Sequence, residues 1–189
     1  GPCGLSCAAE LVKGGYEVTV FEKEASAGGA LRYGIPDYAG HKAVLDEEVE
    51  NLKACGVQFF FGKSVSDVGE LKAQGYEKVF AAVGKSKPVY AAIEGEDARE
   101  FLYKVNCGEK PGVSQRIVVI GSGFAAVDAA RCAVRLGAEH VTLLNPNGFS
   151  KRSGELEALQ DAKAEGVCVF DNVKIAYVAP GGVRCEKDG

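Results

Sequence analysis

The chain has 189 residues, 47% of them apolar and 25% charged, which is the composition of a folded globular protein with a sizeable core. Its net charge of −4 does not favour nucleic acid or an anionic membrane as a partner. No apolar run approaches the roughly 20 residues that span a bilayer, and no signal peptide is present, so we expect no membrane association.

The first part of the chain alternates helices and strands. Residues 1–15 predict a glycine turn that opens a helix, which ends at Gly14-Gly15. The elements expected after it are a strand over 17–21, a tight loop over 27–30, a helix over 42–54, a strand over 57–61, a short helix over 67–74 and a strand over 78–83.

Between residues 85 and 112 the scattered prolines, lysines and acids predict a linker. The first pattern then recurs, with a strand over 116–120, a turn over 121–126, a helix over 127–136, a strand over 140–144, a helix over 155–164 and a strand over 167–170. This alternation predicts an α/β protein with a mainly parallel sheet, built from two such units.

The second unit contains Gly121-x-Gly123-x-x-Ala126 directly after an apolar strand. In such a turn the backbone N–H groups and the positive end of the helix meet at one point, which can bind a pyrophosphate. The first glycine permits the turn, the second lets a phosphate approach, and the third position must be small. The alternative is an ordinary strand-to-helix turn.

The first unit shows only part of the same motif. Gly1-Pro-Cys-Gly4 supplies the end of a glycine turn whose beginning would precede residue 1. Glu22 follows about 20 residues later, where a carboxylate can accept hydrogen bonds from ribose hydroxyls. The alternatives are a solvated acid for Glu22 and a plain loop for Gly28-Gly29.

The seven cysteines include no Cys-x-x-Cys pair. This argues against a metal site, a redox-active dithiol or a run of cluster ligands in this chain. The spacing favours reduced, mostly buried thiols in a cytoplasmic protein.

Longer stretches resemble a known family. GPCGLSCAAELVKGGYEVTVFEKEASAGGALRYGIP, with VFAAVGKSKP and IEGED after it, resembles the FAD-binding half of the glutamate synthase small-subunit family, which includes the flavin part of dihydropyrimidine dehydrogenase. IVVIGSGFAAVDAARCAVRLGAEHVTLL resembles the inserted NADPH domain of that family. The likeness covers nearly the whole chain in one order, and LRYGIP is more specific than either glycine motif.

The resemblance implies two Rossmann-like doubly wound domains, both incomplete: a partial FAD-binding domain over 1–90, a linker over 91–112 and a partial NAD(P)H-binding domain over 113–189. It implies an oxidoreductase that passes hydride from NADPH or NADH to FAD. Electrons would then leave through iron–sulfur clusters outside this chain to a redox partner subunit or domain. We expect the chain to be an internal piece of a longer enzyme, inactive by itself.

The resemblance also implies site residues, none of them a catalytic acid or base, because the two cofactors exchange the hydride themselves. Beside FAD it places Gly1, Pro2, Cys3, Gly4 and Leu5 at the pyrophosphate, Glu22 and Lys23 at the ribose, and Gly29, Ala30, Leu31, Val65 and Gly84 along the cofactor. Around the nicotinamide dinucleotide phosphates it places Gly121, Ser122, Gly123, Phe124, Ala125 and Ala126.

Two positions depart from the family pattern. Ala39 stands where the family commonly has an arginine, and Pro146 replaces the arginine that grips the 2′-phosphate of NADPH. Asn145 carries no charge and rejects neither nucleotide, while Lys151 and Arg152 could pair with that phosphate and give a modest NADPH preference. The alternative is a solvated basic pair.

The departures leave a second class of function open, a non-catalytic module that binds flavin or docks within a larger redox complex. Disulfide reductases of similar build are a weaker alternative, because the redox cysteine pair is absent. His41 and His140 are lone histidines, and His140, which precedes a strand, is expected at the surface or as a cap rather than in catalysis.

Overall fold

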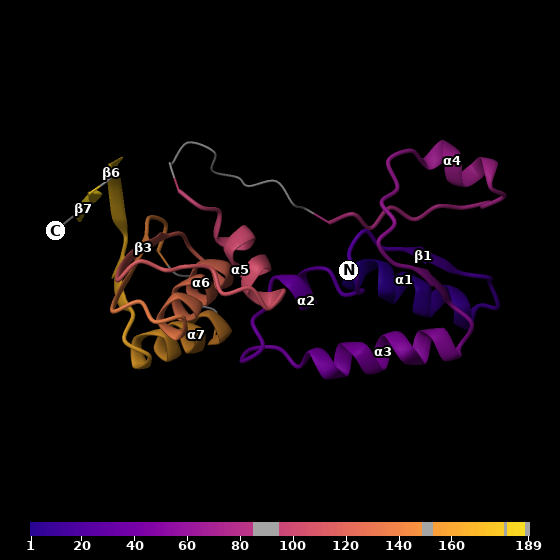
Figure 1. Ribbon diagram of the computed structural model, residues 1–189, viewed down its shortest axis with the longest axis horizontal. Helices are drawn as coiled ribbons and strands as arrows, with labels where there is room; N and C mark the ends of the chain where they lie inside the picture. The colour runs from indigo at the N-terminus through magenta and orange to yellow at the C-terminus, as the bar shows by residue number, and fades with distance from the viewer. Residues whose placement is uncertain (85–94, 149–152, 180, 188–189) are drawn as a thin grey trace. The chain divides into compact units, whose positions relative to one another are not determined.

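The computed structural model describes residues 1–84, 95–148, 153–179 and 181–187. The chain separates into two compact units (Figure 1). Unit 1 comprises Gly1–Tyr33 and Asp37–Ser86, and unit 2 comprises Gly34–Pro36 and Lys87–Gly189.

Unit 1 pairs two short parallel strands and packs helices against them. Its elements are α1 (Pro2–Lys13), β1 (Thr19–Phe21), α2 (Ala30–Tyr33), α3 (Lys42–Ala54), β2 (Gln58–Phe60) and α4 (Val68–Ala73). The register of β1 and β2 runs from Thr19↔Gln58 to Phe21↔Phe60. Their inward side chains join α1 and α3 in a core whose buried members are Leu5, Ala8, Ala27, Val49, Leu52 and Val57.

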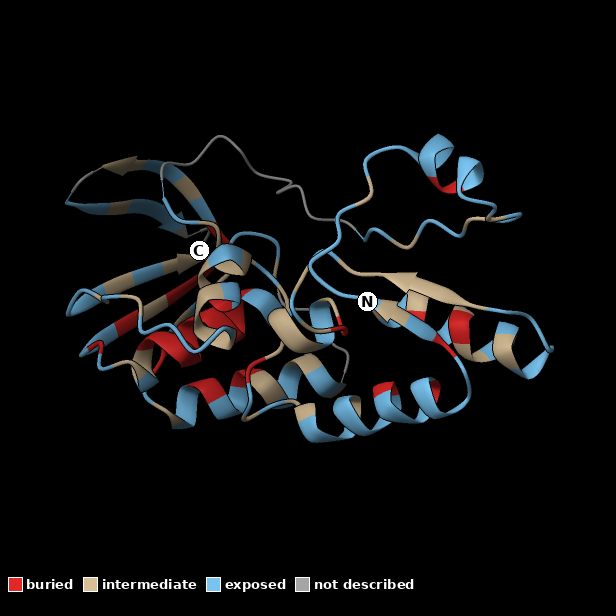
Figure 2. Cartoon of the chain, turned by 45° about the vertical axis from the view of Figure 1, so that its right-hand side comes forward, coloured by how far each residue is buried: buried red, intermediate tan, exposed pale blue. Residues whose placement is uncertain are grey.

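Local chemistry explains where the helices of unit 1 begin and end. Pro2 opens α1, where a missing N–H costs nothing, and the backbone turns at Gly14. The carboxylate of Asp67 accepts a hydrogen bond of 2.7 Å from the Gly69 amide and so caps α4. On α3 the buried positions are Val49 and Leu52, three residues apart, so only one stripe of this helix faces the core (Figure 2).

Unit 2 is built on a three-stranded parallel sheet in the order β3-β4-β5. Its elements are α5 (Ala98–Asn106), β3 (Arg116–Ile120), α6 (Phe124–Arg135), β4 (His140–Asn145), α7 (Ser153–Ala164), β5 (Cys168–Asp171), β6 (Val173–Ala179) and β7 (Gly182–Lys187). The last two strands form an antiparallel hairpin with an irregularity between Ile175 and Tyr177.

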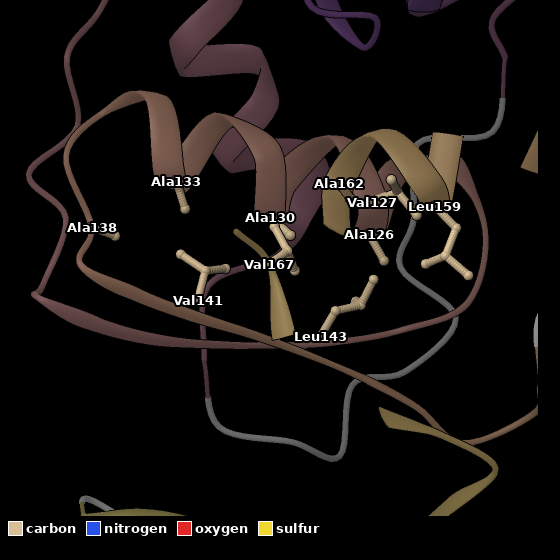
Figure 3. Packing of buried hydrophobic residues seen from close by; sticks show 10 residues of the cluster. All are labelled: Ala126, Val127, Ala130, Ala133, Ala138, Val141, Leu143, Leu159, Ala162 and Val167. Carbon is tan, nitrogen blue, oxygen red and sulfur yellow. The ribbon is translucent and has the colours of Figure 1, made fainter. Parts of the chain in front are cut away.

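The core of unit 2 lies between α6, α7 and one face of the sheet, and it uses small side chains from the helices (Figure 3). Alanines on α6 let the helix approach the sheet closely, and Leu143 of β4 fills the space beneath with no exposed surface. The cluster comprises Ala126, Val127, Ala130, Ala133, Ala138, Val141, Leu143, Leu159, Ala162 and Val167.

Two expectations about elements differ from the structure. Residues 78–83 form no strand; the run passes the start of α1, where a Cβ on Gly4 would lie 3.3 Å from the Ala82 Cβ. Strand-forming residues need a partner ladder, and in the described residues β1 pairs only with β2. Within the expected linker, residues 98–106 form α5, which packs Leu102 inward with 1% of its surface exposed.

The β6–β7 hairpin was not predicted, because its residues alternate only weakly between apolar and polar. The expectation of mostly buried cysteines was wrong. Only Cys132 is buried, and Cys7 is half-buried. The other five are exposed because they stand at helix ends or on outward strand positions, namely Cys3, Cys55, Cys107, Cys168 and Cys185.

Candidate functional site

The glycine turn of unit 1 lies directly against the Gly28-Gly29 loop. Gly29 has φ of 53°, and a Cβ added there would come within 2.7 Å of the Gly1 Cα. Gly28 has φ of 135°, and a Cβ there would meet the side chain of Leu45 at 2.4 Å. Backbone conformation therefore favours glycine at both positions, and at Gly29 the close approach of backbone adds a demand that a plain surface loop would not make.

Glu22 reaches the same point from the end of β1. Its Oε2 lies 3.6 Å from the Gly1 nitrogen, and its Oε1 accepts a hydrogen bond of 3.1 Å from the Glu24 amide. The side chain is only 13% exposed. The structure thus brings together the start of α1 and an acid about 20 residues later, the arrangement by which a Rossmann unit holds a phosphate and a ribose. Lys23, next in sequence, points into solvent.

Sequence reasoning missed the side chains that hold the Gly28-Gly29 loop in place. The Arg32 Nε donates a hydrogen bond of 2.7 Å to the Ala27 carbonyl oxygen, and the same guanidinium pairs with Asp46. The Tyr33 hydroxyl donates to the Ser26 carbonyl oxygen at 3.2 Å. The available signal was Arg-Tyr directly after Gly-Gly-Ala-Leu: two long hydrogen-bonding side chains one helical turn beyond the loop.

Other predicted residues of unit 1 are spread along its surface and loops. Ala30 and Leu31 begin α2, and the Leu31 amide donates to the Gly28 carbonyl oxygen at 3.2 Å. Val65 is half-buried in the loop before α4, and Gly84, with φ of 74°, is exposed. A Cβ added at Gly84 would meet nothing within 4 Å, whereas one added at Gly4 would lie 3.3 Å from the Ala82 Cβ in the 78–83 run.

The glycine turn of unit 2 joins the carboxyl end of β3 to the start of α6. The Gly121 amide donates to the Leu144 carbonyl oxygen at 3.0 Å, and a Cβ on Gly121 would lie 2.9 Å from the Ala126 Cβ. Gly123, the residue before α6, has φ of 101°, and an added Cβ there would meet nothing within 4 Å. The turn is therefore closely packed at Gly121, against Ala126, and open at Gly123.

The open side of this turn presents hydrogen-bond donors. The first amides of α6, at Phe124 and Ala125, have no acceptor within the helix, and both residues are exposed. Ser122 is exposed beside them, and the positive end of the helix dipole adds to their effect. The geometry fits an anionic group such as a phosphate above Gly123.

Asn145 is buried, so its side chain is not free to contact a nucleotide at the end of β4. Its side chain has no exposed surface; the Nδ2 donates to Asp171 Oδ1 at 2.9 Å, and the Oδ1 accepts from the Asn147 amide at 3.1 Å. Asp171 at the end of β5 was not predicted, although an acid following an apolar strand was a visible signal. Lys151 and Arg152 lie outside the described residues.

The Asp-x-Ala-Arg string after the glycine turn has a structural role at Arg131. This guanidinium donates to Glu165 at 2.6 Å and lies 3.2 Å from Asp161, so it links α6 to α7. Arg135 donates to Glu165 as well, at 2.7 Å. Burial raises the pKa of Glu165, but the hydrogen bonds from Arg131 and Arg135 outweigh it and hold the pKa below its usual range.

Both histidines are exposed, which for His140 was expected. His41 precedes α3 and makes no side-chain cap, and His140 begins β4 at the edge of the sheet opposite the glycine turn. Among the residues described, no three His, Cys, Asp or Glu side chains gather where they could hold a metal ion. None of the helices in this part of the chain has the length and apolar character needed to cross a membrane.

Comparison with known proteins identifies a family. The family model for pyridine nucleotide-disulphide oxidoreductases matches residues 1–169. The chain is 36% identical over 178 residues to the NADP(+)-dependent formate dehydrogenase subunit beta of Moorella thermoacetica, covering 88% of this chain and 25% of that protein. It is 30% identical over 208 residues to the glutamate synthase [NADPH] small chain of Escherichia coli, covering 100% and 43%. The chain therefore spans less than half of these relatives' lengths, and the predicted resemblance to the glutamate synthase small-subunit family is confirmed.

Solved structures confirm the fold class, α/β with Rossmann-type units. A 2-naphthoyl-CoA reductase complex matches 99% of this chain and 29% of its own, with a TM-score of 0.79 and 22% identity. FprA from Mycobacterium tuberculosis in complex with NADPH matches 100% of this chain and 65% of its own, with a TM-score of 0.69 and 20% identity.

Proposed function

Because the chain belongs to the pyridine nucleotide-disulphide oxidoreductase family, we propose that it forms the cofactor-binding part of an oxidoreductase in which NADPH or NADH reduces FAD. The reduced nicotinamide supplies the hydride, and the flavin accepts it when both are bound. The residues of this chain bind and orient the two dinucleotides and carry no catalytic acid or base in this proposal.

The observation that carries the proposal is the meeting of Gly1, Gly29 and Glu22 in unit 1. Gly29 leaves no room for a side chain against Gly1, and the Glu22 carboxylate lies 3.6 Å from the Gly1 nitrogen. We assign this point to FAD: the α1 amides of Cys3 and Gly4 would face the pyrophosphate, and Glu22 would accept from the adenosine ribose. Leu5 contributes through its backbone, because its side chain belongs to the core.

Unit 2 would bind the nicotinamide dinucleotide. The space above Gly123 and the amides of Phe124 and Ala125 suit its pyrophosphate, and Ala126 is the small residue on which the turn packs. In this arrangement residues 1–90 serve FAD and residues 113–189 serve NAD(P)H. Because α5 belongs to unit 2, the crossing between the two parts would precede residue 98.

Relatives support a role within a larger assembly. The formate dehydrogenase relative is named as a subunit, and so is the NADPH-Fe(3+) oxidoreductase subunit beta of Geobacter sulfurreducens. The latter is 34% identical to this chain over 184 residues, and the match covers 27% of its length. We propose that electrons pass from FAD to iron–sulfur clusters or a partner subunit outside this chain. A cytoplasmic location remains a prediction.

Replacement of Glu22 tests the flavin assignment. A lost carboxylate leaves ribose hydroxyls unpaired, which should weaken FAD binding by about 1–3 kcal/mol, or roughly 5- to 150-fold, in Glu22→Ala. Glu17→Ala is the matched control, because Glu17 is exposed before the other end of β1. The dissociation constant for FAD, measured from flavin fluorescence, decides; equal affinity of the Glu22→Ala variant and the parent protein would contradict the site.

A second experiment distinguishes catalysis from passive binding. The absence of a donor at Pro146 favours the alternative of a non-catalytic flavin-binding or docking module. In the proposed oxidoreductase, anaerobic NADPH or NADH bleaches the flavin absorbance of the purified, FAD-loaded full-length enzyme that contains this chain. Retention of full absorbance with both nucleotides would support the passive module instead.

A further inference from the structure

We propose that Arg32 is a positioning residue for FAD in unit 1, and that Asp46 on α3 keeps its guanidinium in the orientation that this role requires. The inference rests on the proposed function, because the loop that Arg32 holds is part of the point assigned to the flavin. Gly29 of that loop lies against Gly1, where an added Cβ would come within 2.7 Å of the Gly1 Cα. A displacement of the loop therefore displaces one side of the proposed flavin site.

Arg32 binds the loop on both sides of Gly28. Its Nε donates a hydrogen bond of 2.7 Å to the carbonyl oxygen of Ala27, and Ala27 is buried. Its backbone amide donates to the Gly29 carbonyl oxygen at 3.1 Å. Loss of the side chain would remove a donor from a buried carbonyl group, which is costly because water cannot easily replace it.

The loop fits closely between α2 and α3 at Gly28. A Cβ added there would lie 3.0 Å from the Arg32 Cβ and 2.4 Å from the Leu45 Cδ2. Leu45 packs against the core of unit 1, and Asp46 follows it on α3. The guanidinium of Arg32 pairs with the Asp46 carboxylate. Arg32 thereby joins the loop to a helix that is itself fixed by buried side chains.

The two bonds of the guanidinium differ in strength. The Asp46 side chain is 61% exposed, and an ion pair so open to water contributes little by itself. The Arg32 side chain is only 14% exposed, and its bond to the Ala27 carbonyl uses a charged donor, which makes a stronger hydrogen bond. The carbonyl bond holds the loop, and the ion pair restricts the direction of the planar guanidinium. Loss of the carbonyl bond should therefore weaken FAD binding more than loss of the ion pair.

The connection to affinity is pre-organisation of the loop. A ligand that binds one arrangement of a loop has its apparent affinity reduced by the fraction of the protein in that arrangement. Without the Arg32 side chain the loop keeps the hydrogen bonds between Tyr33 and Ser26 but loses its connection to α3. The arrangement that binds flavin then becomes a smaller fraction of the protein. The net loss of one hydrogen bond corresponds to FAD binding that is about five- to tenfold weaker.

The test measures the dissociation constant for FAD in the full-length enzyme that contains this chain, after the flavin has been removed and titrated back. Arg32→Ala should bind FAD about five- to tenfold more weakly than the parent enzyme. Arg32→Lys keeps a cation but lacks the planar set of donors, so it should recover little of this loss.

Variants of α3 test the part played by the ion pair. Asp46→Ala should weaken FAD binding by about two- to threefold, and it should add nothing further in the Arg32→Ala background, because the two side chains act as one unit. Glu50→Ala is the matched control, since it removes an exposed ion pair with Lys53 on the same helix. It should leave the FAD affinity unchanged, and a loss equal to that of Arg32→Ala would overturn the inference.

A chemical rescue distinguishes positioning from general destabilisation. Ethylguanidinium can occupy the space of the missing side chain and donate in its place, so it should restore part of the FAD affinity of Arg32→Ala. Ethylammonium and sodium chloride at equal concentration should not. Failure of ethylguanidinium to restore FAD affinity, together with a loss of stability in urea, would leave Arg32 with a structural role only and overturn the inference.

The outcomes separate this inference from the proposed function. If Glu22→Ala weakens FAD binding and Arg32→Ala does not, the role of Arg32 is overturned and the flavin site stands. If the parent enzyme binds no FAD, the proposed function fails and this inference fails with it. Should Arg32→Ala not fold, Arg32→Met keeps the apolar stem and removes every donor, and it must weaken FAD binding to the same extent for the inference to hold.

Discussion

Gly29→Ala tests whether the close approach at the first glycine turn is required. Gly29 has φ of 53°, and a new Cβ would lie 2.7 Å from the Gly1 Cα. That neighbour is backbone, so it cannot rotate away as a side chain would. Alanine therefore meets two separate costs: a left-handed backbone conformation and a clash that pushes the start of α1 from the Gly28-Gly29 loop.

A matched control separates these costs. Gly15 has φ of 82°, and a Cβ added there would meet nothing within 4 Å. Gly15→Ala should thus show the conformational cost alone, about 1–2 kcal/mol of unfolding free energy. Gly29→Ala adds overpacking of about 1–3 kcal/mol and should be less stable by that margin.

Urea unfolding and FAD binding are the two measurements. Gly15→Ala should bind flavin as tightly as the parent protein, because the end of α1 is remote from the turn in sequence and holds no predicted contact. Gly29→Ala should lose flavin affinity as well as stability, since α1 amides would no longer point to the same place. Equal unfolding free energies for the two variants, with equal flavin affinity, would refute the close-approach argument.

Two further predictions concern unit 2. Glu165→Gln should be less stable than the parent by on the order of 1 kcal/mol above about pH 5, because it loses charge-assisted bonds from Arg131 and Arg135. The native pKa of Glu165 lies below its unfolded value, so its contribution is present above the unfolded pKa and is lost as the pH falls through the native one; urea midpoints from pH 7 to 3.5 should converge. Convergence toward high pH instead would reject this sign. Lys151→Ala with Arg152→Ala should raise the KM for NADPH several-fold and spare NADH, more so at low salt. Equal effects on both nucleotides, or a parent preference for NADH, would reject the phosphate contact.

Much of the architecture follows from local patterns in the sequence. The apolar periodicity of residues 42–54 predicts α3, because a helix that buries one face must repeat about every 3.6 residues, and α7 was expected over 155–164. The short apolar runs at 116–120 and 140–144 predict β3 and β4, because β-branched and apolar side chains suit a buried strand. Gly121-x-Gly123 marks the turn between β3 and α6, since its steric demands are local.

Contacts distant in sequence were decided only by the tertiary structure. Residues 78–83 have the side chains of a strand, but they pair with no strand among the described residues. Residues 98–106 have the composition of a linker, yet they form a helix whose Leu102 is buried. The approach of Gly29 to Gly1 cannot be read from either residue alone.

Asn145 shows most clearly which features follow from the local sequence and which from the tertiary structure. From sequence it is an uncharged residue at the end of a strand, free to meet a nucleotide. In the structure it is fully buried and bound to Asp171, 26 residues further along the chain. Sequence determined that a polar residue would stand at that strand end, because the strand and its turn are local. That its side chain is buried rather than free was decided by the pairing of β4 with β5, because an amide that is buried must satisfy its hydrogen bonds with whatever the neighbouring strand supplies.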